Sequence, residues 1–387
     1  MKTIAVFFGG QSPEHEISVL TGIQAFHAFD TTKYKPIPIY VTREGFFYTG
    51  KHIVETKEYR HIEILLEKST PVQLQKMKEG VFVTSKKLFG SPNIKIDIAF
   101  LAFHGGIGES GSFQGFCETL GLPYTGSGVL GSSVCMDKIS MKQLLEKTDI
   151  PVSEYFIALE NQFISDRSTT IRDIEKELSY PLFVKPSNGG SSIGISRVKN
   201  NKELELALEL AFSFDSKVLI EKEFEHDTEI NISCLGSWNK DIELSITEEV
   251  YSDNEFLDFE NKYLKGGKSK KISSSSGSKG MASTNRRMPA EVSDALKNKI
   301  EVYARKAFQV LSCQGVARID FLVNKKTDTL VLIEVNTIPG SFAYYLWEAT
   351  GKPFSQLIND MLSLAEKRED EKRKHTRVFS SSIFKNL

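Results

Sequence analysis

The sequence predicts an α/β protein with more than one domain. Along the opening third of the chain, runs with strand-like spacing alternate with runs of helical spacing, which is typical of a mostly parallel sheet flanked by helices. Glycine pairs follow two of the predicted strands, at the sheet edge where α/β proteins bind ligands. At 387 residues, the chain is also too long for one ordinary core and suits two or three domains.

The composition is that of a globular protein, with 40% hydrophobic and 26% charged residues and a formal net charge of -1. This balance gives no electrostatic reason to expect a nucleic acid or a membrane as partner. The apolar run at residues 1–8 is too short for a signal peptide, and no stretch is long enough to span a bilayer. The four cysteines lack metal-site or disulfide spacing, so we expect buried thiols in a cytoplasmic protein.

The first domain is expected at residues 1–126. Strands are predicted at Thr3–Phe8, Lys35–Val41 and Asp97–Phe103, and helices at Glu14–Phe26 and Phe113–Leu120. Gly9-Gly10 and His104-Gly105-Gly106 follow the first and last of these strands, so both loops are candidates for a ligand site.

The second domain is expected at residues 127–216. A helix is predicted at Asp137–Lys147, and strands at Pro181–Lys185 and Ile193–Val198. The glycine-rich turn between these two strands, Pro186–Ser192, predicts a mobile flap.

The third domain is expected at residues 217–387. Strands are predicted at Val218–Lys222, Ile230–Leu235 and Ile242–Thr247, a long amphipathic helix at residues 292–310, and a hairpin formed by Val316–Val323 and Thr329–Val335. The Gly-, Ser- and Lys-rich run Lys265–Arg287 predicts a flexible surface loop. The charge run Glu366–Lys374 predicts the solvated, frayed end of a helix.

Three polar side chains in the predicted hairpin suggest a metal site. Glu334 and Asn336 lie two apart in one strand and so share a face, and Asp320 joins them if the strands pair. Such oxygen ligands suit Mg²⁺ or Mn²⁺ held against substrate phosphates. The alternative is a polar ladder on the sheet surface, although both strands are otherwise apolar.

The run Lys185–Gly194 is a candidate phosphate site. Glycines and serines in a tight turn present N–H groups and hydroxyls to an anion, and Lys185 adds a positive charge. It is not a Walker A sequence, and an ordinary flexible hairpin is the alternative. Lys138 is a second candidate cation for phosphate, against the simple interpretation of a solvated lysine.

Acidic residues provide two weaker candidates. Glu221 lies at the end of a predicted strand and Glu229 follows that strand. They suit an adenine amino group and a ribose hydroxyl, or are simply exposed charges at a strand end. Glu14 or Glu16, beside Gly9-Gly10, either holds a substrate ammonium group or complements the dipole of the following helix.

Taken in chain order, these motifs resemble the D-alanine–D-alanine ligases of the ATP-grasp superfamily. The matching runs are GGQSPEHEIS (9–18), HGGIGESG (104–111), QG (114–115), PYTGSG (123–128), MDK (136–138), KPSNGGSSIG (185–194), FLDFENKY (256–263), ARID (317–320) and EVNTIPG (334–340). They cover most of residues 1–351. The resemblance implies a three-domain ATP-grasp fold, with a Rossmann-like parallel sheet first and ATP held between the central and C-terminal domains.

The resemblance also implies roles for individual residues. Contacts to ATP are implied for Lys138, Lys185, Ser192, Glu221, Lys222, Phe224 and Glu229, and two Mg²⁺ or Mn²⁺ ions for Asp320, Glu334 and Asn336. Catalytic roles are implied for Glu14, Ser191, Tyr263, Arg318 and Gly340, and substrate contacts for His104 and Ser341. In this interpretation Glu14 holds the ammonium of the first D-alanine, Ser191 and Tyr263 form a lid contact, and Arg318 and Gly340 stabilise the transferring phosphate and the tetrahedral intermediate.

The implied reaction activates one D-alanine carboxylate with the γ-phosphate of ATP, and the acyl phosphate is then attacked by a second D-alanine. Phosphoryl transfer depends on positioning and charge neutralisation, and a reactive acyl phosphate requires that closing loops exclude water. The intact pair Lys262-Tyr263 implies an amine as acceptor rather than D-lactate. The product would enter peptidoglycan synthesis, and the family implies a homodimer.

Two departures from the family pattern keep other functions open. The loop Gly266–Arg287 is extended, and about four residues are missing after Gly340, where Ser341 and Phe342 are the candidates to surround the acceptor carboxylate. A ligase for another acceptor, such as D-serine or a natural-product amine, is the first alternative. A nucleotide-binding regulator with a decayed site is the second, against which the retained lysines, metal ligands and arginine argue.

Overall fold

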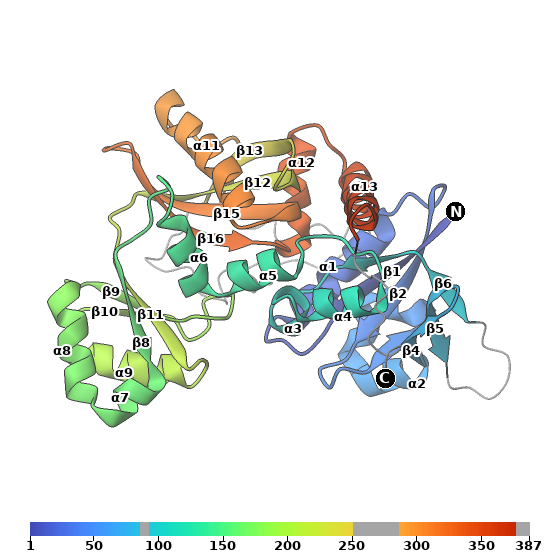
Figure 1. Cartoon of the computed structure of the whole chain (residues 1–387), viewed down its shortest axis with the longest axis horizontal. Coiled ribbons are helices and arrows are strands. Elements are labelled where there is room, and N and C mark those ends of the chain that lie inside the picture. The colour runs from blue at the N-terminus through green and yellow to red at the C-terminus, as the bar shows by residue number, and fades with distance from the viewer. Residues whose placement is uncertain (86–92, 251–285, 377–387) are drawn as a thin grey trace, which may run out of the picture.

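The computed structural model describes residues 1–85, 93–250 and 286–376, which form three sheets with their helices (Figure 1). Tyr263, the run 256–263 and most of the loop predicted at 265–287 lie outside the described residues. Within the described ranges, no helix is both long and apolar enough to cross a bilayer. All four cysteines are buried with free thiols.

The first sheet has seven strands in the order β6-β5-β4-β3-β2-β1-β7. Its strands are β1 (Lys2–Gly9), β2 (Tyr34–Val41), β3 (Phe47–Thr49), β4 (Thr70–Met77), β5 (Gly80–Ser85), β6 (Ile94–Ile96) and β7 (Ile98–Leu101). The core β2-β1-β7 is parallel, while β3 to β6 extend it antiparallel. The predicted α/β fold is confirmed, but the sheet is mixed rather than mostly parallel.

Helices cover this sheet and connect it to the rest of the chain. They are α1 (His15–Ala28), η1 (Lys51–Val54), η2 (Thr56–His61), α2 (Ile62–Glu67), α3 (Gly106–Glu109) and α4 (Ser112–Leu120), followed by the linking helices α5 (Val129–Met136) and α6 (Lys138–Leu145). Residues 4–8 of β1 are fully buried, as expected of a strand covered on both faces. At the end of β1, Gly9 has φ +90°, and a Cβ there would lie 2.3 Å from the Val41 carbonyl oxygen, so the turn toward α1 requires glycine.

The second sheet is antiparallel, in the order β10-β9-β11-β8. Its elements are β8 (Tyr155–Leu159), α7 (Glu160–Ser165), α8 (Arg167–Glu177), β9 (Leu182–Pro186), β10 (Ser196–Val198), α9 (Asn201–Phe212) and β11 (Lys217–Lys222). The three helices pack on the sheet around a small separate core, at the end of the molecule away from the first sheet (Figure 1).

The third sheet is also antiparallel, in the order β14-β13-β12-β15-β16. Its elements are β12 (Thr228–Ser237), β13 (Ile242–Val250), β14 (Arg286–Arg287), α11 (Asp294–Val310), β15 (Gln314–Asn324) and β16 (Thr329–Asn336). On β15 the odd positions Ala317, Ile319 and Phe321 share a core with the apolar face of α11. Since side chains alternate along a strand, Arg318 and Asp320 face the opposite side.

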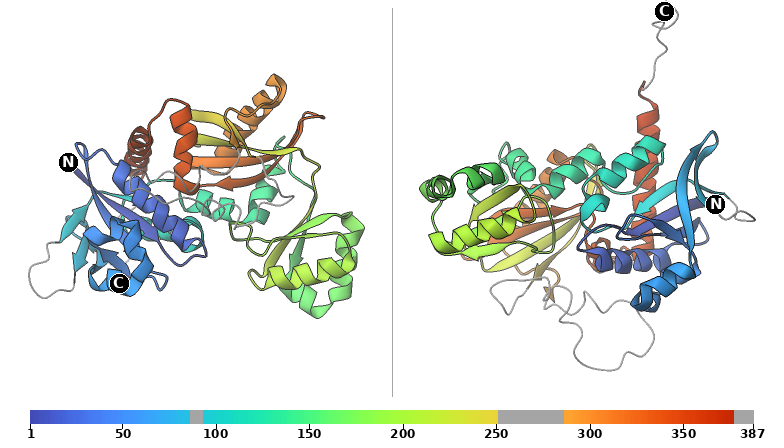
Figure 2. Two further views of the ribbon diagram at one scale, coloured as in Figure 1. Left: turned by 180° about the vertical axis from the view of Figure 1, so that it is seen from behind. Right: turned by 90° about the horizontal axis from the view of Figure 1, so that it is seen from below.

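The last elements return the chain to the first sheet. They are η4 (Gly340–Ala343), α12 (Tyr344–Ala349) and α13 (Phe354–Arg373), and α13 lies between the first and third sheets (Figures 1 and 2). The expectation of a solvated, frayed end at Glu366–Lys374 is wrong for most of this run. The helix is regular to Arg373, and Arg368 lies over the Tyr124 ring, 3.9 Å from its centroid.

Candidate functional site

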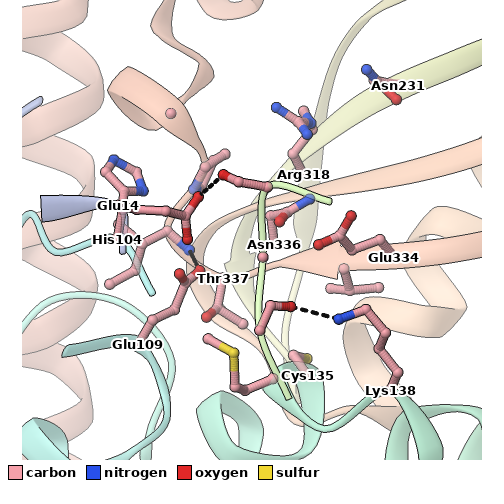
Figure 3. Close-up of a pocket in the computed structure, with 18 of the residues that line it drawn as sticks. Glu14, His104, Glu109, Cys135, Lys138, Asn231, Arg318, Glu334, Asn336 and Thr337 are labelled. Carbon is pink, nitrogen blue, oxygen red and sulfur yellow. Dashed lines mark hydrogen bonds between the residues drawn. The ribbon is translucent and has the colours of Figure 1, made fainter. Parts of the chain in front are cut away.

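A pocket lies where the three sheets meet, and segments from all of them form its wall (Figure 3). Nine of the predicted site residues line it: Glu14, His104, Lys138, Ser191, Glu229, Arg318, Glu334, Asn336 and Gly340. Lys185, Ser192, Glu221, Lys222, Phe224, Asp320 and Ser341 do not lie on this wall.

A row of polar side chains crosses the third sheet, and three of its members, Asn231, Glu248 and Glu334, line the pocket. Asn231 of β12 is paired in register with Glu248 of β13 and with Asp320 of β15, and Asp320 is paired with Glu334 of β16. Directly paired residues point to the same face of a sheet, so four polar groups lie in one line. The hairpin predicted from the sequence therefore brings Asp320 and Glu334 together, with Asn336 two residues further along β16.

Asp320 is at the centre of this row and only 2% exposed. Its carboxylate accepts two hydrogen bonds from Arg318, from Nε and Nη2, both at 2.7 Å, and a third from Asn336 Nδ2 at 3.0 Å. Burial acts to lower the pKa of Arg318, but the Asp320 carboxylate raises it well above its ordinary value. Arg318 is therefore a permanent cation on the pocket wall.

The same side chains fit a divalent cation. Asp320, Glu334 and Asn336 supply hard oxygen donors from adjacent strands, and no described residue pairs with the Glu334 carboxylate. Within the described ranges there is no group of three His, Cys, Asp or Glu side chains placed to hold a metal. Substrate phosphates and water would have to complete the coordination, as is usual for Mg²⁺.

The predicted flap closes one side of the pocket. Lys138, the first residue of α6, donates to the Gly189 carbonyl oxygen at 2.5 Å, and its backbone N–H donates to the Ser187 carbonyl oxygen at 2.9 Å. The flap then reaches the first sheet, where the Ser191 hydroxyl donates to the Glu14 carboxylate. The flap is thus held from both sides, by α6 and by the start of α1.

The structure distinguishes the two acidic candidates near the N-terminus. Glu14 is the N-cap residue of α1, but its side chain does not cap the helix and points across the pocket toward Ser191 (Figure 3). Glu16 instead pairs with Arg43 at the surface. Of the two, Glu14 is therefore the carboxylate that lines the pocket.

His104 lines the pocket and is neutral. Its Nε2 is 2.8 Å from the Thr21 hydroxyl, and burial lowers its pKa to about 4. The Thr21 hydroxyl also accepts from the Ser341 N–H at 3.2 Å, so His104 and the segment after Gly340 share one anchor on α1.

Sequence reasoning missed Glu109, which joins two loops of the site. One carboxyl oxygen accepts from the Gly105 N–H at 2.9 Å and the other from the Ile338 N–H at 3.1 Å. Burial and then the neighbouring Glu14 raise its pKa to about 8. The signal in the sequence was an acidic residue inside the glycine-rich run after β7, at residues 104–111.

A second missed group lies at the other end of the polar row. The buried Glu248 carboxylate accepts from Tyr345 Oη at 2.7 Å, from Arg286 Nη1 at 3.1 Å and from Asn231 Nδ2 at 3.2 Å. Asn231, Glu248 and Arg286 also line the pocket. Nothing in the spacing of these residues predicted their meeting, because they come from three separate segments.

The residues predicted to bind adenosine divide into two groups. Glu229 lies on the pocket wall, whereas Lys222 pairs with Glu154 near the surface at 3.3 Å, and Phe224 is half-buried after β11. Glu221 is 4% exposed and pairs with two lysines, Lys142 and Lys185. Burial acts to raise the pKa of Glu221, but these lysines lower it to about 2.

The segment after Gly340 turns away from the pocket. Ser341, Phe342 and Ala343 have φ of 50°, 57° and 49°, three successive residues in the left-handed region. The Ser341 hydroxyl donates to Gln24 Oε1 at 2.5 Å, and Phe342 packs on Phe100 with ring centroids 5.1 Å apart. The structure therefore brings Gly340 to the pocket but not the side chains of Ser341 and Phe342.

Known proteins resemble this chain over nearly its whole length. Residues 3–127 match the family described as D-ala D-ala ligase N-terminus, and residues 144–363 the one described as D-ala D-ala ligase C-terminus. The D-alanine–D-alanine ligase of Thermosipho melanesiensis is 37% identical over 96% of each chain, and that of Thermosipho africanus is 38% identical over 99% of this chain and 98% of its own.

Solved structures of ligases are also similar to this chain. The D-alanine-D-alanine ligase of Coxiella burnetii superposes with a TM-score of 0.78 at 26% identity, covering 96% of each chain. The VanG D-Ala:D-Ser ligase of Enterococcus faecalis superposes with a TM-score of 0.76 at 27% identity, covering 94% of this chain and 99% of its own. Among the similar structures there are thus ligases named for two different acceptors.

Proposed function

The chain belongs to the D-alanine–D-alanine ligase family, and from this membership we propose that it joins two D-alanine molecules. The reaction converts ATP and two D-alanine to D-alanyl-D-alanine, ADP and phosphate, and its product serves peptidoglycan precursor synthesis. The fold is the three-domain ATP-grasp fold of the family. One observation carries the proposal: Glu14, from the start of α1, lines the same pocket as Arg318, Glu334 and Asn336 of the third sheet.

The first step transfers the γ-phosphoryl group of ATP to a carboxylate oxygen of the first D-alanine. The bond from the γ-phosphorus to the bridging oxygen breaks, which leaves ADP and a D-alanyl phosphate. Glu14 is placed to hold the ammonium group of this D-alanine, and Arg318 to face the negative charge on the phosphoryl group. Such a transfer needs mainly positioning and charge stabilisation, which these two side chains supply.

In the second step, the amine of the second D-alanine attacks the carbonyl carbon of the acyl phosphate, and phosphate leaves. Negative charge develops on the carbonyl oxygen, where we assign stabilisation to Arg318 and the backbone at Gly340. Water would hydrolyse the acyl phosphate, so the flap at Ser187–Ser192 is assigned to exclude it. Tyr263, the expected partner of Ser191 in the lid, lies outside the described residues.

We assign two Mg²⁺ or Mn²⁺ ions to Asp320, Glu334 and Asn336. When bound, such ions neutralise charge on the ATP phosphates. Lys138, on the pocket wall beside the flap, and Lys185, on β9, are assigned to the phosphates, with Ser192. Glu221, Lys222, Phe224 and Glu229 are assigned to the adenosine.

The acceptor is the part of the proposal with a specific rival. A relative in Enterococcus faecalis is named a D-Ala:D-Ser ligase, and the side chains of Ser341 and Phe342 face away from the pocket. An acceptor such as D-serine or a natural-product amine is therefore the second candidate. A decayed nucleotide-binding regulator is disfavoured, because the lysines, the acidic ligands and Arg318 are all retained.

Three further assignments accompany this function. We propose a substrate-binding domain at 1–126, a central ATP-grasp domain at 127–216 and a C-terminal catalytic domain at 217–387. We also propose a homodimer, which sedimentation at micromolar concentration would test, and a cytoplasmic location, where ATP and D-alanine are available.

The decisive experiment measures ATP-dependent phosphate release with D-alanine, D-serine, L-alanine and D-lactate, with the products identified by mass. D-Alanyl-D-alanine as the main product is the expected result. A mixed product formed in preference to the D-alanine dimer would transfer the assignment to the second candidate. No release with any substrate, despite ATP binding, would favour the regulator.

A further inference from the structure

Helix α6 presents a second lysine next to the nucleotide side of the site. Lys142 lies four residues after Lys138 and therefore on the same face of the helix, one turn further along. Whereas Lys138 reaches the flap, Lys142 is only 1% exposed. Lysine is almost never buried to this degree unless its charge is paired.

The partner of Lys142 is Glu221, at the end of β11. Lys142 Nζ lies 2.5 Å from Glu221 Oε1, while Lys185 pairs with the other carboxyl oxygen, Oε2. The ring of Tyr155 also lies near the Lys142 ammonium, 5.7 Å away at its centroid, and Glu146 acts on the ammonium electrostatically. Two cations thus share one buried carboxylate, and the group carries an excess positive charge.

The two lysines differ in their freedom to leave Glu221. The side chain of Lys185 is 18% exposed and stands on β9, directly before the flap, whereas the side chain of Lys142 is enclosed between α6 and the second sheet. Lys185 is therefore the member of the group that a phosphate can attract. Lys142 is the member that remains paired with Glu221.

We propose that Lys142 is a positioning residue, which holds Glu221 in place so that Lys185 can exchange this carboxylate for a nucleotide phosphate. The inference rests on the proposed function, in which Lys185 binds ATP. If Lys185 leaves, Glu221 and Lys142 remain as a neutral buried pair. Without Lys142, the same movement leaves a buried carboxylate with no cation, which is strongly unfavourable.

The first test is Lys142→Met, which keeps the length of the side chain and removes its charge. We expect the Kd for Mg-ATP, measured by titration calorimetry, to rise about 100-fold, since breaking a buried ion pair is that costly. The KM for D-alanine should change less than about threefold, because Glu14 and Arg318 are untouched. Lys142→Arg, which retains the charge, should stay within about tenfold of the parent protein.

The second test is the double variant Lys142→Met with Glu221→Gln. Because Glu221 is itself assigned to the adenosine, the double variant is compared with Glu221→Gln alone. Without a buried carboxylate to retain Lys185, the loss of ATP affinity caused by Lys142→Met should shrink to less than about tenfold. A lysine with a merely structural role predicts the same loss of about 100-fold in both backgrounds. If Lys142→Met does not fold, Lys142→Gln replaces it, with the same expected losses.

The outcomes separate this inference from the proposed function. An unchanged Kd for ATP in Lys142→Met, or an undiminished effect of Lys142→Met in the Glu221→Gln background, overturns the role of Lys142. ATP binding by the parent protein without any ligation overturns the proposed function and leaves the Kd comparison valid. A parent protein that does not bind ATP overturns both.

Discussion

At the scale of single residues, Glu334 is the clearest test of the candidate metal site. Its carboxylate lies on the pocket wall beside Asp320, and no residue in the described ranges pairs with it. Glu334→Gln keeps the shape but removes the charge that a divalent cation requires. We expect ligase turnover to fall at least about 1,000-fold, while the free energy of unfolding changes by less than about 1 kcal/mol.

The control for Glu334 is Glu301→Gln, a partly exposed glutamate on α11. Its activity and stability should match those of the unchanged protein. Near-normal turnover in Glu334→Gln would remove Asp320, Glu334 and Asn336 from the metal assignment. A loss of turnover that is accompanied by unfolding would not support the metal assignment either. Turnover and the free energy of unfolding are therefore both measured.

Glu109 yields a prediction about pH. Burial raises its pKa to about 8, above its value in the unfolded chain. A group with a raised folded pKa contributes its full stability below the unfolded pKa and loses it as pH rises toward the folded value. Glu109→Gln cannot titrate, so between pH 5 and 8 its stability relative to the parent should increase, by about 1–3 kcal/mol.

This pH dependence is read from denaturant unfolding of the two proteins at each pH. In Glu109→Gln the amide NH2 group cannot accept a hydrogen bond, so one of the two N–H donors, Gly105 or Ile338, loses its acceptor. The free-energy cost of this lost hydrogen bond is the same at every pH. Only the change with pH of the stability difference between the two proteins therefore reports the titration of Glu109. A constant difference between the two proteins across this range would show that Glu109 is ionised throughout.

At the scale of elements, the flap and α1 are fitted closely at Gly190. A Cβ added there would lie 2.8 Å from Glu14 Oε2, although the backbone of Gly190 is not in the left-handed region. Gly190→Ala should therefore separate the flap from Glu14 without straining its own backbone. We expect kcat/KM for D-alanine to fall about tenfold, because a small displacement of positioned groups is costly.

Gly115→Ala is the matched control for the flap. Gly115 lies in α4, and the nearest atom to an added Cβ is Val129 Cγ2 at 3.9 Å, an ordinary contact. Alanine should stabilise this helix slightly and leave kinetics unchanged. If Gly190→Ala retained full activity, the closed contact between Ser191 and Glu14 would have no part in catalysis.

The elements also show how far the sequence could be interpreted. The hairpin of β15 and β16 was predicted because a buried apolar face alternates with Arg318, Asp320, Glu334 and Asn336. Glu248 was not found as part of the same row, since its pairing with Asn231 depends on the register of β12 and β13. Register between strands is a property of three-dimensional pairing, which spacing along one strand does not contain.

The strands of the first sheet give a similar lesson. The parallel strands β1, β2 and β7 are apolar runs and were predicted, whereas β3 and β6 have three residues each and were not. Strands as short as these take their structure from their neighbours in the sheet rather than from their own propensity. The turn of Ser341 away from the pocket could not be predicted from the sequence either, because it follows from hydrogen bonds to α1.

At the scale of the whole molecule, α13 connects the third sheet to the first. The helix follows the strands of the third sheet along the chain, yet Arg368 donates to the Gly126 carbonyl oxygen at 2.8 Å and also to that of Tyr124. Lys372 reaches Glu118 of the first domain at 2.6 Å. Since the pocket is built from both sheets, this helix helps to fix their relative position.

Arg368→Ala tests that connection. It removes the cation over the Tyr124 ring and leaves two carbonyl oxygens without their donor, which together should lower the free energy of unfolding by about 2–4 kcal/mol. Because Glu14 and Arg318 line the pocket from the two parts of the fold that α13 joins, kcat should fall as well, by about tenfold. Lys367→Ala, at the adjacent exposed position, should change neither quantity. Equal behaviour of the two variants, in denaturant unfolding and in phosphate release, would mean that α13 is only a surface addition to the fold.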